Sequence, residues 1–226
     1  MKNDMRAAGI AASVLGLCYV FGFAMLASVM NPGDTAGWLP QDKLEFVLQR
    51  AALFQLWNLV IYVVFGVVLV VLAAALHRLL AQPQSLLMAV ATPLGMIWAG
   101  LVIASGMLVS VALPAVAGRF ADDPEAATQL WSTIAIVQDG LGGGVEVVGG
   151  LWLLLLSVAA AKARELLPPW LNIVGILVGV AGILTVIPAL QALGAVFGLG
   201  QIAWFVGVGI GLLRRAPSTP TAATPP

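Results

Sequence analysis

Long stretches without a single charged residue constrain this chain more than any other feature of its sequence. Residues 170–213 contain no Asp, Glu, Lys or Arg, and residues 7–30 are equally free of charge. A helix of about 20 mostly apolar residues is long enough to cross the hydrocarbon core of a bilayer. Only 9% of the residues are charged and 61% are apolar. A soluble domain of this size could not bury so much apolar surface. The sequence therefore predicts an all-α, polytopic membrane helix bundle surrounded by lipid.

Composition and motifs also argue against several function classes. The net charge is zero, which gives no basis for a nucleic-acid partner. Cys18 is the only cysteine and should be a small packing residue, because one thiol can form neither an internal disulfide nor a zinc site. The chain contains neither a G-x-S-x-G elbow nor a P-loop. We therefore expect no enzyme activity, no metal and no cofactor.

Six apolar segments are expected to cross the membrane as one domain over residues 1–215. The uncharged stretch 170–213 is too long for one span, so a tight hairpin near Pro188 fits best. Residues 125–139 are mixed in polarity and should extend the fourth span beyond the core as one long helix. Residues 216–226, rich in Pro and Thr, should form a disordered cytoplasmic tail. The expected spans are about 7–30, 51–76, 86–117, 141–161, 170–188 and 192–213.

The distribution of basic residues between the loops predicts the orientation. With six spans, both termini and the second and fourth loops share one side, and positively charged loops stay in the cytoplasm. Most acidic residues fall on the opposite side, so we expect both termini to be cytoplasmic. The basic residues of the expected cytoplasmic side are Lys2, Arg6, Arg78, Lys162, Arg164, Arg214 and Arg215, against Lys43, Arg50 and Arg119 on the other side.

Four polar residues are expected at similar depth in the outer half of the membrane. Asp139 and Glu146 are seven residues apart, which places them on one helix face about 10 Å apart along the axis. Arg50 and Asn58 share a face of the second span. A charge in the bilayer costs about 2.5–3.5 kcal/mol or more when it is unpaired. We therefore expect Arg50, whose planar guanidinium suits a carboxylate, to pair with Glu146 or Asp139.

This polar cluster admits two interpretations. The first, slightly preferred, is an Arg–carboxylate clamp between two helices in a structural or accessory membrane protein. The second is a small polar pocket, open to the outside, that binds a substrate or passes protons, as in a small-solute transporter or binder. A paired, dry Arg50 would favour the clamp, whereas a cavity reaching Glu146 would favour the pocket.

Glycines gather around Glu146, at positions 140, 142, 143, 144, 149 and 150. Each glycine in a helix costs roughly 1 kcal/mol relative to alanine, so some other interaction has to offset that cost. Close helix packing is the preferred explanation, and glycine-rich faces could also join copies of the chain as a homo-oligomer. The alternative is a broken helix that exposes backbone groups to a ligand, as in some transporters.

Several short motifs stand at the ends of the expected spans, over about residues 6–215. Together they resemble the small bacterial membrane proteins of domain-of-unknown-function family 4386. The resemblance implies six helices in a bacterial cytoplasmic membrane, with no activity or site residues to transfer, and Arg50 as the polar position to be shared. The motifs are Arg6-Ala-Ala-Gly-Ile, Gln49-Arg50-Ala-Ala-Leu, Leu76-His77-Arg78-Leu79-Leu80, Gly150-Leu-Trp152-Leu-Leu-Leu-Leu, Leu167-Pro168-Pro169-Trp170-Leu171, Ile202-Ala-Trp204-Phe205 and Gly211-Leu-Leu-Arg214-Arg215.

Overall fold

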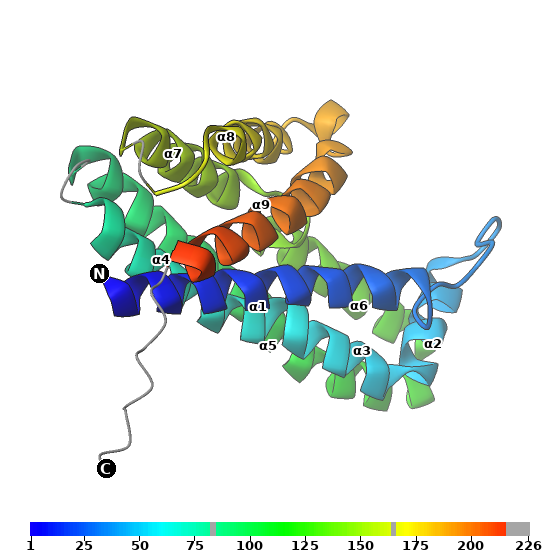
Figure 1. Cartoon of the computed structure of the whole chain (residues 1–226). Coiled ribbons are helices and arrows are strands. Elements are labelled where there is room, and N and C mark those ends of the chain that lie inside the picture. The colour runs from blue at the N-terminus through cyan, green and yellow to red at the C-terminus, as the bar shows by residue number, and fades with distance from the viewer. Residues whose placement is uncertain (82–84, 164–165, 216–226) are drawn as a thin grey trace, which may run out of the picture.

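The computed structural model describes residues 1–81, 85–163 and 166–215, and within these ranges the chain is helical and contains no strand (Figure 1). The all-α prediction is therefore confirmed, while the expected disordered tail, residues 216–226, lies outside the described residues. The elements are α1 (Lys2–Ala27), α2 (Pro40–Gln49), α3 (Ala51–Asn58), the π-helix η1 (Leu59–Val64), α4 (Phe65–Leu80), α5 (Ser85–Asp122), α6 (Pro124–Gln138), the π-turn η2 (Asp139–Gly143), α7 (Val147–Ala163), α8 (Pro169–Leu184), the 3₁₀ turn η3 (Pro188–Leu190) and α9 (Leu193–Arg215).

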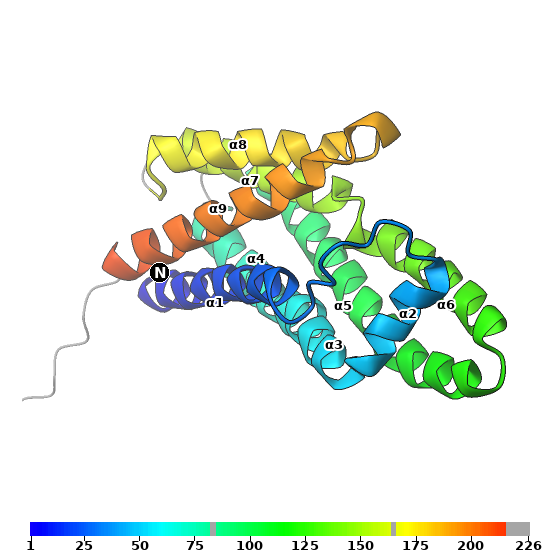
Figure 2. The same cartoon turned by 90° about the vertical axis from the view of Figure 1, so that its right-hand side faces the viewer.

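Helices that pack together run antiparallel, as the pairing of α1 with α9 shows. A Cβ added at Gly9 would touch Leu213, one at Gly16 would touch Val206, and one at Gly198 would touch Phe23. Residues later in α1 therefore contact residues earlier in α9, so the two helices are antiparallel. Figures 1 and 2 show α1 beginning and α9 ending at the same end of the bundle.

Polar contacts tie the helix ends together at that end of the bundle. The Nε of Arg78, near the end of α4, lies 3.2 Å from a carboxylate oxygen of Asp4 near the start of α1. The guanidinium of Arg215, at the end of α9, donates to the carbonyl of Leu166 at 2.8 Å. Arg78 and Arg215 thus lie on the same side as the N-terminus, as the predicted distribution of basic loops requires.

Five helical segments in the described part of the chain are long and apolar enough to cross a membrane. They are Lys2–Ala27, Ala51–Leu80, Leu86–Asp122, Pro124–Ala163 and Leu193–Arg215. The fifth pass in chain order, α8, has only 16 residues. At 1.5 Å per residue it is about 24 Å long, shorter than the roughly 30 Å hydrocarbon core. It ends before the residues 185–188 expected within it, and a loop containing η3 follows, near the predicted hairpin at Pro188.

Local sequence signals account for several helix ends. The Asp123 carboxylate accepts the Ala126 backbone N–H at 3.0 Å, and Pro124 occupies the first turn of α6, where its missing N–H is not needed. The residues Asp123-Pro124-Glu125, a cap followed by a proline and an acid in the first turn, therefore account for the start of α6. Helix α5 reaches Asp122, five residues past the expected boundary, and includes Pro93 and Pro114 in its interior.

Large aromatic side chains fill the centre of the bundle. Trp98 from α5, Trp152 from α7 and Trp204 from α9 are each almost fully buried, and their rings meet in sequence at centroid distances of 5.6 and 5.8 Å. The outer surface carries exposed apolar side chains, such as Leu17, which is 66% exposed, and Val111, which is 74% exposed. An aromatic core inside an apolar exterior suits a bundle surrounded by lipid.

Candidate functional site

The fourth pass is broken in its middle rather than continuous. Helix α6 ends at Gln138, a π-turn covers Asp139–Gly143, and α7 does not begin until Val147. Gly142 has a φ of +131°, a backbone conformation that residues other than glycine rarely adopt. The expectation of one long helix is therefore wrong here, because the backbone leaves helical geometry at the glycine run and a new helix starts afterwards.

The two glycines beyond the break serve close packing instead. A Cβ added at Gly149 would lie 2.6 Å from the Trp98 ring, and one at Gly150 would lie 2.6 Å from the carbonyl oxygen of Gly179 on α8. The packing explanation is thus right for Gly149 and Gly150. The helix is broken at Gly142, as the alternative required, while the exposure of backbone groups to a ligand there stays a prediction.

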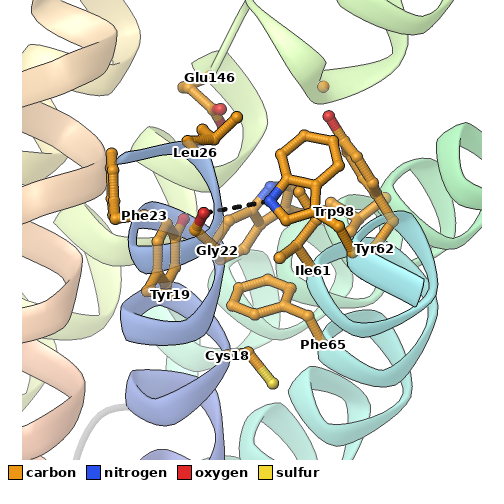
Figure 3. A pocket seen from close by; sticks show the side chains of 13 residues that line it. Cys18, Tyr19, Gly22, Phe23, Leu26, Ile61, Tyr62, Phe65, Trp98 and Glu146 are labelled. Atoms are coloured by element: carbon orange, nitrogen blue, oxygen red, sulfur yellow. Dashed lines mark hydrogen bonds between the residues drawn. The ribbon is translucent and has the colours of Figure 1, made fainter. Parts of the chain in front are cut away.

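Helix α8 fixes the position of Glu146 at the end of this break. The backbone N–H of Glu146 donates to the Thr185 hydroxyl at 2.8 Å, and that hydroxyl donates to the Gly182 carbonyl at 2.7 Å. The Glu146 carbonyl accepts the Gly150 N–H at 2.8 Å, which starts the hydrogen-bond ladder of α7. The backbone of Glu146 is therefore held on both sides, and its side chain points into a pocket (Figure 3).

That pocket has a volume of about 240 Å³ and lies between α1, the α3–η1–α4 segment, α5 and the break. Figure 3 shows Glu146 at one end, Phe65 and Cys18 at the other, and Tyr19 and Tyr62 on facing sides. Six of the thirteen lining residues are aromatic, and Glu146 is the only ionisable acid or base, apart from tyrosine and cysteine, among the described residues of the lining. The lining residues are Cys18, Tyr19, Gly22, Phe23, Leu26, Trp57, Ile61, Tyr62, Phe65, Trp98, Val102, Gly142 and Glu146.

Contacts between the rings hold the aromatic wall in place. The Tyr19 ring meets Phe65 edge-on at 5.3 Å, and Phe65 meets Trp98 in the same manner at 5.7 Å. The indole N–H of Trp57 donates to the carbonyl of Gly22 on α1 at 3.1 Å. Such edge-to-face pairs and a satisfied indole N–H give the wall a defined shape in the absence of a ligand.

The Glu146 carboxylate faces this pocket without a direct polar partner. Across residues 1–81, 85–163 and 166–215 it accepts no hydrogen bond and forms no ion pair. A carboxylate in an apolar pocket is costly unless something compensates its charge. The pocket is therefore where water, a proton or a cationic group has to meet Glu146.

Arg50 lies elsewhere, and the pairing predicted for it is absent. Its guanidinium carbon is 3.9 Å from the centroid of the Phe46 ring, and its Nη1 donates weakly to the Phe46 carbonyl at 3.4 Å. In the described part of the chain Arg50 forms no ion pair with Asp139 or Glu146. The physical reason is a backbone bend at Arg50, with a φ of −117°, which ends α2 and lets the side chain fold back along that helix.

The other two members of the expected cluster also lie outside the pocket. Asn58 is fully buried and links α3 to α5, because its amide donates to the Gly106 carbonyl at 2.8 Å and to the Ser110 hydroxyl at 3.2 Å. Asp139 is exposed, and its carbonyl accepts the N–H groups of Gly144 and Val145 within the break. Of the four predicted residues, only Glu146 lines the pocket.

The aromatic residues of the pocket were the ones that sequence reasoning missed. Tyr19 and Phe23 are four residues apart on α1, and Trp57, Ile61 and Phe65 follow the same spacing on the second pass. Such a spacing is equally typical of a packed core, so the pattern alone could not separate a ligand-binding wall from ordinary helix packing. Cys18, expected as a packing residue, is buried and lies at the pocket wall.

The donor set gives no metal site in the described residues, since no three His, Cys, Asp or Glu side chains come together there. Comparison of the chain with family models, with curated proteins and with solved structures finds no match. The resemblance to domain-of-unknown-function family 4386 therefore stays a prediction.

Proposed function

We propose that this chain is a multi-pass protein of the bacterial cytoplasmic membrane that binds a small solute in the pocket around Glu146. The observation that carries the proposal is a carboxylate without a polar partner, placed at a helix break and facing a preformed aromatic pocket. Ligand sites of this kind combine an apolar lining with a few convergent polar groups. Broken helices at substrate sites are a recurring device of membrane transporters, so transport is the activity that this arrangement suits.

The structural clamp is the weaker alternative for this chain. It required a paired Arg50, and the guanidinium contacts Phe46 instead. Groups outside the pocket hold the helices together. Asn58 forms a hydrogen bond with the Gly106 carbonyl, and Gly150 packs closely against Gly179. The pocket residues are therefore not needed as the clamp, which leaves them available to a solute.

Two adjacent cysteine substitutions test whether the pocket is open to water. In a Cys18→Ser background, Tyr19→Cys places a thiol in the pocket wall, whereas Val20→Cys places one on the outer surface, where Val20 is 47% exposed. The two positions lie at nearly the same depth. A charged, water-soluble methanethiosulfonate reagent should modify Tyr19→Cys in membranes and leave Val20→Cys, which faces lipid, unmodified.

The outcome discriminates between a wet pocket and a dry core. If Tyr19→Cys in the folded protein is as unreactive as Val20→Cys, the pocket admits no solute and the proposed function is wrong. Denaturation in detergent, after which both thiols should react fully, controls for the reagent and for the amount of protein.

We also propose that both termini are cytoplasmic, which places the loop between α1 and α2 outside the cell. Support comes from the ion pair between Arg78 and Asp4, which brings a basic loop end to the N-terminal side, and from the retention of positively charged loops in the cytoplasm.

A further inference from the structure

We propose that the pocket around Glu146 selects an organic cation, a small amine or a trimethylammonium group. This inference rests on the proposed function and adds the class of ligand to it. It follows from the charge of the lining, from the faces of its aromatic rings and from the size of the pocket.

The charge of the lining excludes anions and disfavours neutral solutes. Glu146 is the only Asp, Glu, Lys, Arg or His among the residues that line the pocket. An anion would be repelled by the carboxylate in a medium of low dielectric constant. A neutral solute brings no opposite charge, so the carboxylate would have to take up a proton when that solute displaces water. A cation removes both penalties, because it supplies the opposite charge that Glu146 lacks within the described structure.

The pocket lining favours an organic cation over calcium or magnesium. Tyr19, Trp57, Tyr62 and Trp98 present rings around one cavity, and the faces of such rings attract ammonium groups through their quadrupoles, as in aromatic cages. Calcium requires six to eight oxygen ligands and magnesium an octahedral set. The side chains of the lining offer only the Glu146 carboxylate and two phenol hydroxyls, too few for either ion.

Pocket dimensions set the size and the orientation of the ligand. The volume of about 240 Å³ falls below the roughly 300–1,000 Å³ of pockets for drug-sized ligands. Glu146 lies at one end, and Phe65 lies at the opposite end (Figure 3). The cationic head therefore sits against Glu146 and the tyrosine rings, and a short apolar remainder points toward Phe65.

Choline and its neutral isostere 3,3-dimethyl-1-butanol form the matched pair of probes for this inference. The two molecules have nearly the same shape and differ in the quaternary nitrogen that one carries and the other lacks. Binding of each is measured by isothermal titration calorimetry on the full chain, purified in a neutral detergent. We expect choline to bind at least tenfold more tightly than the isostere.

Two variants separate the carboxylate from the rings. Glu146→Gln should weaken choline binding at least tenfold and leave binding of the isostere within twofold. Glu125→Gln makes the same chemical change at an exposed position in the first turn of α6 and should leave both affinities unaltered. Phe23→Leu keeps an apolar wall and removes one ring face, so it should weaken choline and spare the isostere. Thermal unfolding of each variant confirms that it is folded.

The inference and the proposed function fail in different ways. Equal binding of choline and the isostere, or choline binding that folded Glu146→Gln retains in full, overturns cation selection and leaves a solute pocket in place. Failure of choline to bind also overturns cation selection. The proposed function is refuted by an unreactive Tyr19→Cys, whatever the choline titrations give.

Discussion

Replacing Gly150 with alanine should destabilise the bundle, although alanine is the better helix former. A Cβ at Gly150 would lie 2.6 Å from the Gly179 carbonyl oxygen, 2.7 Å from the Ile183 nitrogen and 3.0 Å from the Gly182 carbonyl carbon. All three atoms belong to the backbone of α8, so no rotamer change relieves the overlap. Helices α7 and α8 have to move apart along their whole contact.

The expected magnitude follows from two opposing effects. Alanine gains about 1 kcal/mol of helix propensity over glycine. Overpacking costs typically about 1–3 kcal/mol, and the upper part of that range applies because the obstructing atoms are backbone. The net loss of unfolding free energy is therefore about 2 kcal/mol. Gly100 in α5 provides the matched control, because a Cβ there meets no atom within 4 Å, and Gly100→Ala should be neutral or stabilising by up to about 1 kcal/mol.

The unfolding free energy of both variants is measured by reversible unfolding in mixed micelles with increasing sodium dodecyl sulfate. Far-ultraviolet circular dichroism follows the loss of helix. The reasoning requires opposite signs at the two positions. A Gly150→Ala protein as stable as the parent, or more stable than Gly100→Ala, would show that α7 and α8 are not in backbone contact, and the close-packing interpretation would have to be abandoned.

Three further predictions concern the site and the topology. Thr185→Val removes the acceptor of the Glu146 N–H and should lower the unfolding free energy by about 1–3 kcal/mol in the same assay. Thr185→Ser keeps the hydroxyl and should lower it less. Equal losses for the two variants would contradict a role for this hydrogen bond. Arg50→Gln should leave choline affinity within twofold, because Arg50 contacts Phe46 rather than Glu146. A tenfold change measured by calorimetry would show that Arg50 acts on the pocket after all. In a Cys18→Ser background, an impermeant maleimide added to whole cells should label Asp34→Cys and not Lys2→Cys, and labelling of both would refute the proposed orientation.

Much of the fold follows from the sequence, because charge-free stretches and loop signals are local properties. The second pass was expected over residues 51–76 and runs from Ala51 to Leu80. The cap at Asp123 and the hairpin near Pro188 also lie where their residue types predict them. In each case residues that are close in sequence determine the local structure, so a single sequence is enough to predict it.

The composition of the site depends on backbone geometry that no local pattern encodes. The sequence argument assumed a regular helix through Arg50, but the bend between α2 and α3 directs its guanidinium to Phe46. The break at Gly142 was one of two open alternatives, because a glycine run permits both close packing and a left-handed residue. The rings around Glu146 come from α1, the second pass and α5, and only the tertiary arrangement brings these three segments together.

The seam between α1 and α9 has a consequence for biosynthesis. During translation α1 is made long before α9, so its Gly9 and Gly16 surface lacks its native neighbour until Val206 and Leu213 have been made. Helix α1 also carries one wall of the pocket through Tyr19 and Phe23. Phe205 of α9 packs against the rings of Tyr19 and Phe65. The pocket wall therefore gains this support only when the last helix docks, and a nascent chain stalled before Leu193 would lack it.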